Sequence, residues 1–190
     1  MEVLSGAEAL EETVKAVRGP RLLHLATHGF FLVDQRRGDE ETQAGLEDPL
    51  LRSGVLLAGA SRTLAGAPPS GLEDGVLTAY EAATLDLHGT ELVTLSACET
   101  GLGDIRNGEG VFGLRRSFQV AGAQAVLMSL WAVPDRETQE LMALFYDEWL
   151  AGHDKHDALR RAQGALRRMV QKRYGQDLPY YWGAFVLVGL

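Results

Sequence analysis

The sequence contains only one cysteine, Cys98, among its 190 residues. An internal disulfide is therefore excluded, and with it a small fold that depends on disulfides. A lone thiol fits a reducing compartment, so we expect a cytoplasmic protein. Met1 to Ala9 carries two glutamates and no apolar block, so it does not resemble a signal peptide. Apolar runs such as 185–188 are much shorter than the roughly 20 residues that cross a bilayer, so no membrane association is expected.

Positive charge is also scarce. Eighteen Lys and Arg residues face 26 Asp and Glu residues, which gives a net charge of −8. This balance argues against a general nucleic-acid binder, because such proteins need a basic face to displace counterions from phosphates. It permits a substrate or partner that carries positive charge. The 46% of hydrophobic residues is typical of a globular chain of this length, so we expect one domain over residues 1–190.

Short apolar segments alternate with segments of helical periodicity. The short runs have the length and composition of strands that are covered on both faces, and their alternation with helices predicts an α/β fold with a largely parallel central sheet. Residues 30–47 and the Gly- and Pro-rich stretch 59–75 are interpreted as loops. The predicted strands are 21–27, 53–58, 91–97, 124–130 and 182–190, and the predicted helices are one between Ser5 and Gly19-Pro20 and those at 78–85, 109–121, 136–150 and 158–172.

Four helix starts carry capping signals, and the first is Ser5-x-x-Glu8, a capping box that opens a predicted helix ended by Gly19-Pro20. Thr78 and Glu81 have the spacing of a capping box, in which a hydroxyl and a carboxylate each satisfy a free backbone N–H group. Asp135 and Asp154 stand where N-caps belong, just before the two helices that follow the strand at 124–130.

Two of the predicted strands end in residues with catalytic chemistry. The strand at 21–27 is followed by His28, and the strand at 91–97 is followed by Cys98. If these strands are neighbours in a parallel sheet, the imidazole and the thiol meet at the same rim. A nearby imidazolium favours the thiolate, which is the nucleophilic form of cysteine. Gly29 lets the chain approach a carbonyl closely, so its N–H and that of Cys98 are candidates for an oxyanion hole.

These segments resemble a known family. The motifs are HLATHGFF around His28, LSACETGLG around Cys98, GEG at 108–110, AGA at 121–123, SLWAVPD at 129–135 and YYWGAFVLVG at 180–189. Together they resemble a CHAT domain, a relative of caspases, separases and gingipains. The resemblance implies a caspase-like three-layer α/β/α sandwich and a cysteine endopeptidase with His28 and Cys98 as its dyad. It implies no metal and no organic cofactor.

The resemblance also implies features of regulation and substrate binding. CHAT domains usually carry a further strand and helix upstream and follow helical repeats, so we expect this chain to lack upstream elements and to work with a regulatory helical-repeat region. Peptide substrates in this superfamily lie along the segment after the third strong strand, here 129–133, which includes Ser129 and Trp131. Such pairing uses backbone hydrogen bonds. Asp135 corresponds to an acidic pocket residue of relatives that cut after basic residues, and it also suits an N-cap.

Three alternatives remain open at this stage. A zinc site from His24, His28 and Cys98 is conceivable, but the spacing is not one that zinc enzymes use, and a packed strand histidine is the favoured interpretation of His24. The sequence Gly108-x-Gly110-x-x-Gly113 matches a dinucleotide-binding motif but does not directly follow a strand. A non-catalytic scaffold with the same fold is the third alternative.

Overall fold

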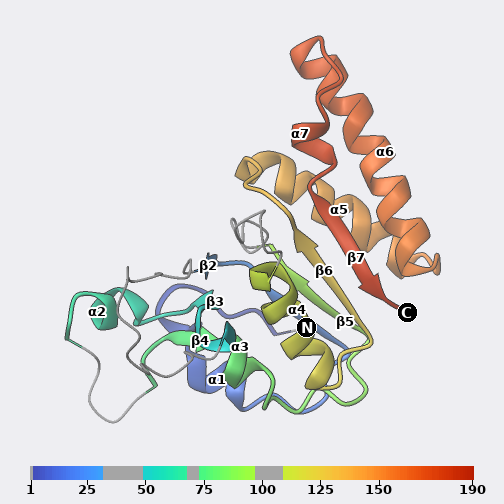
Figure 1. Cartoon of the computed structure of the whole chain (residues 1–190). Helices are drawn as coiled ribbons and strands as arrows, with labels where there is room; N and C mark the ends of the chain where they lie inside the picture. The colour runs from blue at the N-terminus through green and yellow to red at the C-terminus, as the bar shows by residue number, and fades with distance from the viewer. Residues whose placement is uncertain (1, 32–48, 68–72, 97–108) are drawn as a thin grey trace, which may run out of the picture.

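The computed structural model describes residues 2–31, 49–67, 73–96 and 109–190. Within these ranges a central four-stranded sheet has the order β1-β5-β6-β7 (Figure 1). β1, β5 and β6 run parallel, and β7 runs antiparallel to β6, which confirms the prediction of a largely parallel sheet. The strands of this sheet are β1 (Leu22–Leu25), β5 (Leu92–Leu95), β6 (Ala125–Ser129) and β7 (Phe185–Gly189).

Helices cover both faces of this sheet, as its apolar strands require. Side chains alternate between faces along β6, so Val126 belongs to one apolar cluster and Leu127 to the other. The first face packs against α4 through Phe118, and the second packs against α5 and α6 through residues such as Phe145 (Figure 1). The result is the caspase-like α/β/α sandwich expected above. These helices are α4 (Glu109–Val120), α5 (Asp135–Leu150) and α6 (Lys155–Tyr174).

A second, small antiparallel sheet was not expected from the sequence. It has the order β2-β3-β4, and β2 follows β1 after a two-residue turn. A Cβ at Gly54 would lie only 2.4 Å from the Leu77 carbonyl oxygen, so glycine is needed in the middle strand. The predicted loop 59–75 contains a helix, α2 (Ala60–Leu64), within its described part. The strands are β2 (His28–Phe31), β3 (Ser53–Leu56) and β4 (Val76–Thr78).

The capping predictions have mixed outcomes. Thr78 and Glu81 form the expected capping box. Ser5 was wrong as a capping residue: its side chain makes no cap hydrogen bond, only a 3₁₀ turn follows it, and the helix α1 starts later, at Glu11. Asp154 accepts a hydrogen bond from the backbone N–H of Asp157 at 2.8 Å and starts α6. Asp135 was wrong as an N-cap: Pro134 precedes the helix, Asp135 is its first residue, and no side chain caps it.

Short helical segments complete the described fold. A 3₁₀ turn and a one-turn helix lie near the N-terminus, a second 3₁₀ turn precedes β3, and a one-turn helix precedes β7. No helix within the described ranges is both long and apolar enough to cross a membrane. The segments are η1 (Gly6–Glu8), α1 (Glu11–Lys15), η2 (Pro49–Leu51), α3 (Ala79–Ala82) and α7 (Pro179–Trp182).

Candidate active site

The strands that precede the predicted dyad are direct neighbours. β1 pairs with β5 in parallel, with Leu25 opposite Leu95. His28 follows Leu25 by three residues, and Cys98 follows Leu95 by three residues. In the sequence, each member of the dyad therefore comes three residues after one member of this residue pair, past the carboxyl end of its strand. The condition stated from the sequence, that these strands are neighbours, is met, while Cys98 itself lies outside the described residues.

His28 starts β2, at the junction between the two sheets. Its backbone is fixed in the small sheet opposite Leu56, and the Thr27 hydroxyl donates a hydrogen bond to the carbonyl oxygen of that same Leu56. The side chain of His28 is exposed, and within the described residues its imidazole has no hydrogen-bond or ion-pair partner. A fixed backbone with a free imidazole suits a group that has to act on a bound molecule. Gly29, next along β2, lies opposite Val55, and its oxyanion role stays a prediction.

The predicted substrate segment begins inside the sheet and ends outside it. Ser129 is buried at the end of β6, opposite Phe185 of β7. The N–H of Leu130 continues this pairing by donating to the Ala184 carbonyl oxygen at 2.8 Å. From 131 to 133, the backbone makes no backbone hydrogen bond to the described residues. A bound peptide could therefore form more backbone hydrogen bonds with residues 131–133 than with residues 129–130.

Trp131, within this segment, and Asp135, just after it, differ in burial and in hydrogen bonding. Trp131 is half-buried against the α5–α6 cluster, and its indole N–H donates to the Tyr180 carbonyl oxygen at 2.9 Å. This bond fixes the ring beside the segment. The Asp135 carboxylate is exposed rather than enclosed in a pocket, and it has no hydrogen-bond or ion-pair partner among the described residues. It is therefore free to meet a charged ligand.

A polar network, which no sequence pattern indicated, lies on the α5 side of the same strands. His24 Nε2 lies 2.8 Å from Ser96 Oγ, and His24 Nδ1 lies 3.1 Å from the Tyr146 hydroxyl. Tyr146 donates to Thr94 Oγ1 at 2.9 Å. Burial lowers the pKa of His24 and raises the pKa of Tyr146 to about 12, so both side chains are neutral near pH 7.

The network removes the support for the zinc alternative. Both ring nitrogens of His24 already have hydrogen-bond partners, so the imidazole has no lone pair free for a metal. His24 is enclosed between the sheet and α5, whereas the His28 side chain is exposed. The prediction of a packed strand histidine is the better description of His24.

The dinucleotide-binding alternative also loses its structural basis. That motif needs a strand that runs directly into a glycine-rich turn and then into a helix. Here α4 begins at Glu109, so Gly110 and Gly113 are helical residues. A Cβ at Gly113 would lie 3.3 Å from Ser53 Oγ, so this glycine serves the close packing of α4 on β3.

Three carboxylates come together elsewhere, but a lysine already lies among them. Oxygen atoms of Glu11, Glu73 and Glu81 lie within 4.8 Å of one another. The Lys15 ammonium is 2.7 Å from Glu11, 3.0 Å from Glu73 and 2.9 Å from Glu81. Burial opposes the charge on Lys15, but the hydrogen bonds to these carboxylates outweigh it and raise the lysine pKa. The cluster is thus an internal ion-pair network in which Lys15 holds the cation position.

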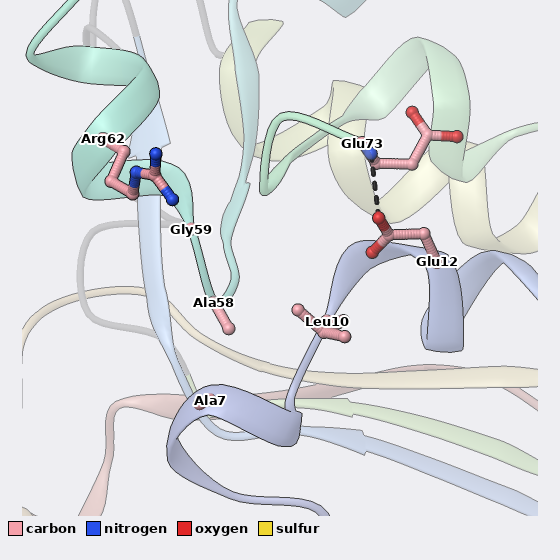
Figure 2. A pocket seen from close by; sticks show the side chains of 7 residues that line it. All are labelled: Ala7, Leu10, Glu12, Ala58, Gly59, Arg62 and Glu73. Atoms are coloured by element: carbon pink, nitrogen blue, oxygen red, sulfur yellow. Dashed lines mark hydrogen bonds between the residues drawn. The ribbon is translucent and has the colours of Figure 1, made fainter. Parts of the chain in front are cut away.

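A pocket of about 210 Å³ opens next to this cluster, between the N-terminal segment and α2 (Figure 2). Arg62 lies on one side of it, and Glu12 lies on the other side, where it accepts a hydrogen bond from the Glu73 N–H at 2.8 Å. Neither His28 nor any residue of 129–133 lines this pocket. Its lining comprises Ala7, Leu10, Glu12, Ala58, Gly59, Arg62 and Glu73.

Comparison with known proteins identifies the family. The model of the CHAT domain, a family related to caspase-like peptidases, matches residues 1–190. The chain is 32% identical over 132 residues to human tetratricopeptide repeat protein 28, which covers 70% of this chain and 5% of that protein. The mouse protein of the same name is 32% identical over 127 residues, covering 67% of this chain and 5% of that protein. The chain thus corresponds to a small part of these relatives, and it belongs to the CHAT domain family.

Proposed function

We propose that this chain is a cysteine endopeptidase that uses Cys98 as nucleophile and His28 as general acid and base. The observation that carries the proposal is the parallel pairing of β1 and β5, with Leu25 opposite Leu95. Counted along the sequence, His28 and Cys98 each lie three residues beyond this pair, and α/β proteins bind ligands beyond the carboxyl ends of their strands. The free imidazole of His28 supports the same role.

The proposed reaction has two stages. The Cys98 thiolate attacks the carbonyl carbon of the scissile peptide bond, and His28 donates its proton to the departing amine, which leaves a thioester on the sulfur. Water then attacks the thioester while His28 accepts a proton from it, so the acid product leaves and the thiol is restored. The N–H groups of Gly29 and Cys98 would stabilise the oxyanion in both stages. No metal is required by this chemistry.

The substrate would be a protein segment that lies along 131–133 as an extended strand. Backbone pairing of this kind gives affinity, while pockets for side chains give specificity. The free, exposed carboxylate of Asp135 lies just beyond this backbone and would favour a Lys or Arg side chain. We therefore infer that cleavage follows a basic residue.

The setting we propose is cytoplasmic and linked to helical repeats. A single cysteine fits a reducing compartment. The two relatives above are named tetratricopeptide repeat proteins, so we infer that a helical-repeat region, in the same protein or in a partner, regulates the peptidase.

The test is labelling by peptide acyloxymethyl ketones that carry a basic, an acidic or an apolar residue before the warhead. Intact-mass spectrometry would compare wild type with Cys98→Ala and His28→Ala. We expect one adduct on wild type, none on Cys98→Ala, and slower labelling of His28→Ala. The basic peptide should react fastest, and Asp135→Asn should remove that preference.

The contrary result is equally clear. If Cys98 reacts no faster than a free thiol, and loss of His28 changes nothing, the chain is not a competent peptidase. A non-catalytic scaffold that works by binding partners would then be the better description.

A further inference from the structure

The buried network around His24 links three elements of the fold that the proposed reaction depends on. His24 lies on β1, four residues before His28. Ser96 directly follows β5, two residues before Cys98. Tyr146 lies on α5, the helix that begins at Asp135. One imidazole therefore connects the chain segments that lead to both members of the dyad and to the proposed specificity residue.

The direction of each hydrogen bond in this network can be assigned. Tyr146 donates its hydroxyl proton to Thr94 Oγ1, so its oxygen is left to accept from His24 Nδ1–H. A neutral imidazole carries one N–H, so Nε2 has a free lone pair and accepts the proton of Ser96 Oγ. The chain of donors runs from Ser96 to His24, then to Tyr146, and ends on Thr94, which is fully buried. Every member has a defined partner.

The network acts at the point where pairing between the two strands ends. His24 lies opposite Thr94 in the register, and the last paired residues are Leu25 and Leu95. One residue further, the N–H of Ser96 still donates to the Leu25 carbonyl oxygen, at 3.2 Å. The side-chain bond from Ser96 to His24, at 2.8 Å, adds a second link on the α5 face. Two bonds thus hold Ser96 against β1, two residues before Cys98 in the sequence.

We propose that His24 is a positioning residue, which holds Ser96 through Nε2 and Tyr146 through Nδ1 so that the segments bearing Cys98 and His28 leave the sheet in a fixed relative orientation. This role rests on the peptidase function proposed above. His24 does not touch substrate in this proposal; it acts through the geometry of the dyad. Small displacements of reacting groups lower rates strongly, so loss of the network has a kinetic signature.

The experiment measures the inactivation of the full chain by the best acyloxymethyl ketone peptide. His24→Leu keeps the apolar packing but removes both hydrogen bonds, whereas His24→Gln can still bond to Ser96. We expect kinact to fall roughly 10- to 100-fold in His24→Leu, with KI nearly unchanged. His24→Gln should recover part of that loss. The pH profile of Cys98 alkylation by iodoacetamide should shift toward that of an ordinary thiol, near pH 8.5, in His24→Leu.

A stability control separates positioning from general weakening of the fold. Val170→Ala removes buried apolar volume from α6 on the same face of the sheet, without touching the network. It should lower the melting temperature as His24→Leu does, yet keep wild-type kinact and the wild-type pH profile. If His24→Leu does not fold, Ser96→Ala replaces it, because this change deletes only the hydroxyl that His24 holds.

The possible results separate this proposal from the peptidase function. Suppose that wild-type Cys98 is reactive and that the network variant, His24→Leu or its replacement Ser96→Ala, keeps the wild-type kinact. The positioning role is then overturned, and the peptidase function stands. If Val170→Ala lowers kinact as much as His24→Leu, His24 serves stability alone. If wild-type Cys98 reacts no faster than a free thiol, the peptidase function fails and the positioning role falls with it.

Discussion

Among single residues, His24 has a protonation state that its surroundings determine. Desolvation between β1, β5 and α5 lowers its pKa below the usual 6.5. Its nearest titratable neighbour, Tyr146, has a pKa raised to about 12 by burial and so carries no charge to compensate a protonated imidazole. Folding therefore favours neutral His24, and the stability of the chain should depend on pH for this reason.

We predict that acidification destabilises the wild type through His24. The unfolded state gains a proton near pH 6.5, whereas the folded state resists it until a lower pH. The stabilisation from neutral His24 is complete above pH 6.5 and decreases as the pH falls toward the folded-state pKa, by up to about 1.4 kcal/mol per pH unit. Urea unfolding at several pH values between about 7.5 and 5.5 should show a smaller pH slope for His24→Gln. Equal slopes in both proteins would contradict this account.

Functional residues could be predicted from the sequence where a local pattern marks them. Residues that depend on contacts between distant segments could not be predicted. His28 and Cys98 could be proposed because each directly follows a short apolar run, and the pairing of β1 with β5 supports that reasoning. The partners of His24 lie 72 and 122 residues away in the sequence. No local pattern marks such contacts, since only the tertiary fold brings β5 and α5 to the same side chain.

Among the elements, α5 and α6 each have an aspartate at their N-terminus, Asp135 as the first residue of α5 and Asp154 as the N-cap of α6, and the two have different roles. Asp154 accepts the N–H of Asp157 and satisfies a helix donor, whereas Asp135 caps nothing and is exposed. We predict that Asp154→Ala lowers the free energy of unfolding by about 1 kcal/mol, the usual value for a lost N-cap. Asp135→Ala should cost about 0.5 kcal/mol or less, because only an interaction with the helix dipole is lost.

Urea denaturation of both aspartate variants provides the measurement, with each acting as the control for the other. An equal loss of stability would mean that Asp135 does cap its helix in solution. If only Asp154→Ala lowers the stability strongly, Asp154 has a structural role. If Asp135→Asn also loses the preference for basic peptides, Asp135 has a binding role. The two residues look alike from the sequence because each stands just before a helical pattern.

The small sheet shows why some elements could not be predicted. β3 falls within the predicted strand 53–58, but β2 and β4 were missed, because four and three residues are too few for a clear alternation of apolar and polar side chains. β2 begins at His28, inside a motif already interpreted in chemical terms, and β4 follows a Gly- and Pro-rich stretch. The central strands, at four or five residues each, are hardly longer, but they were correctly predicted because helices cover both faces of their sheet, which gives continuous apolar runs.

For the whole molecule, the net charge of −8 acts on any substrate before specific contacts form. A negative field attracts basic peptides over distances comparable to the Debye length, and salt shortens that range. We predict that kinact/KI for the basic acyloxymethyl ketone falls several-fold as salt rises from about 20 mM to about 500 mM. The apolar peptide should change little, because it carries no charge for the field to act on.

The salt series also separates the overall field from the contact with Asp135. Asp135→Asn removes one charge of the net −8, so most of the long-range attraction should survive in this variant. At high salt only short-range contacts remain effective, so we expect Asp135→Asn to lose the preference for basic over apolar peptides under that condition. The same variant should keep most of the salt dependence of the rate. If the variant instead loses the salt dependence and keeps the high-salt preference, Asp135 does not contact the basic side chain. Substrate selection would then belong to another part of the surface.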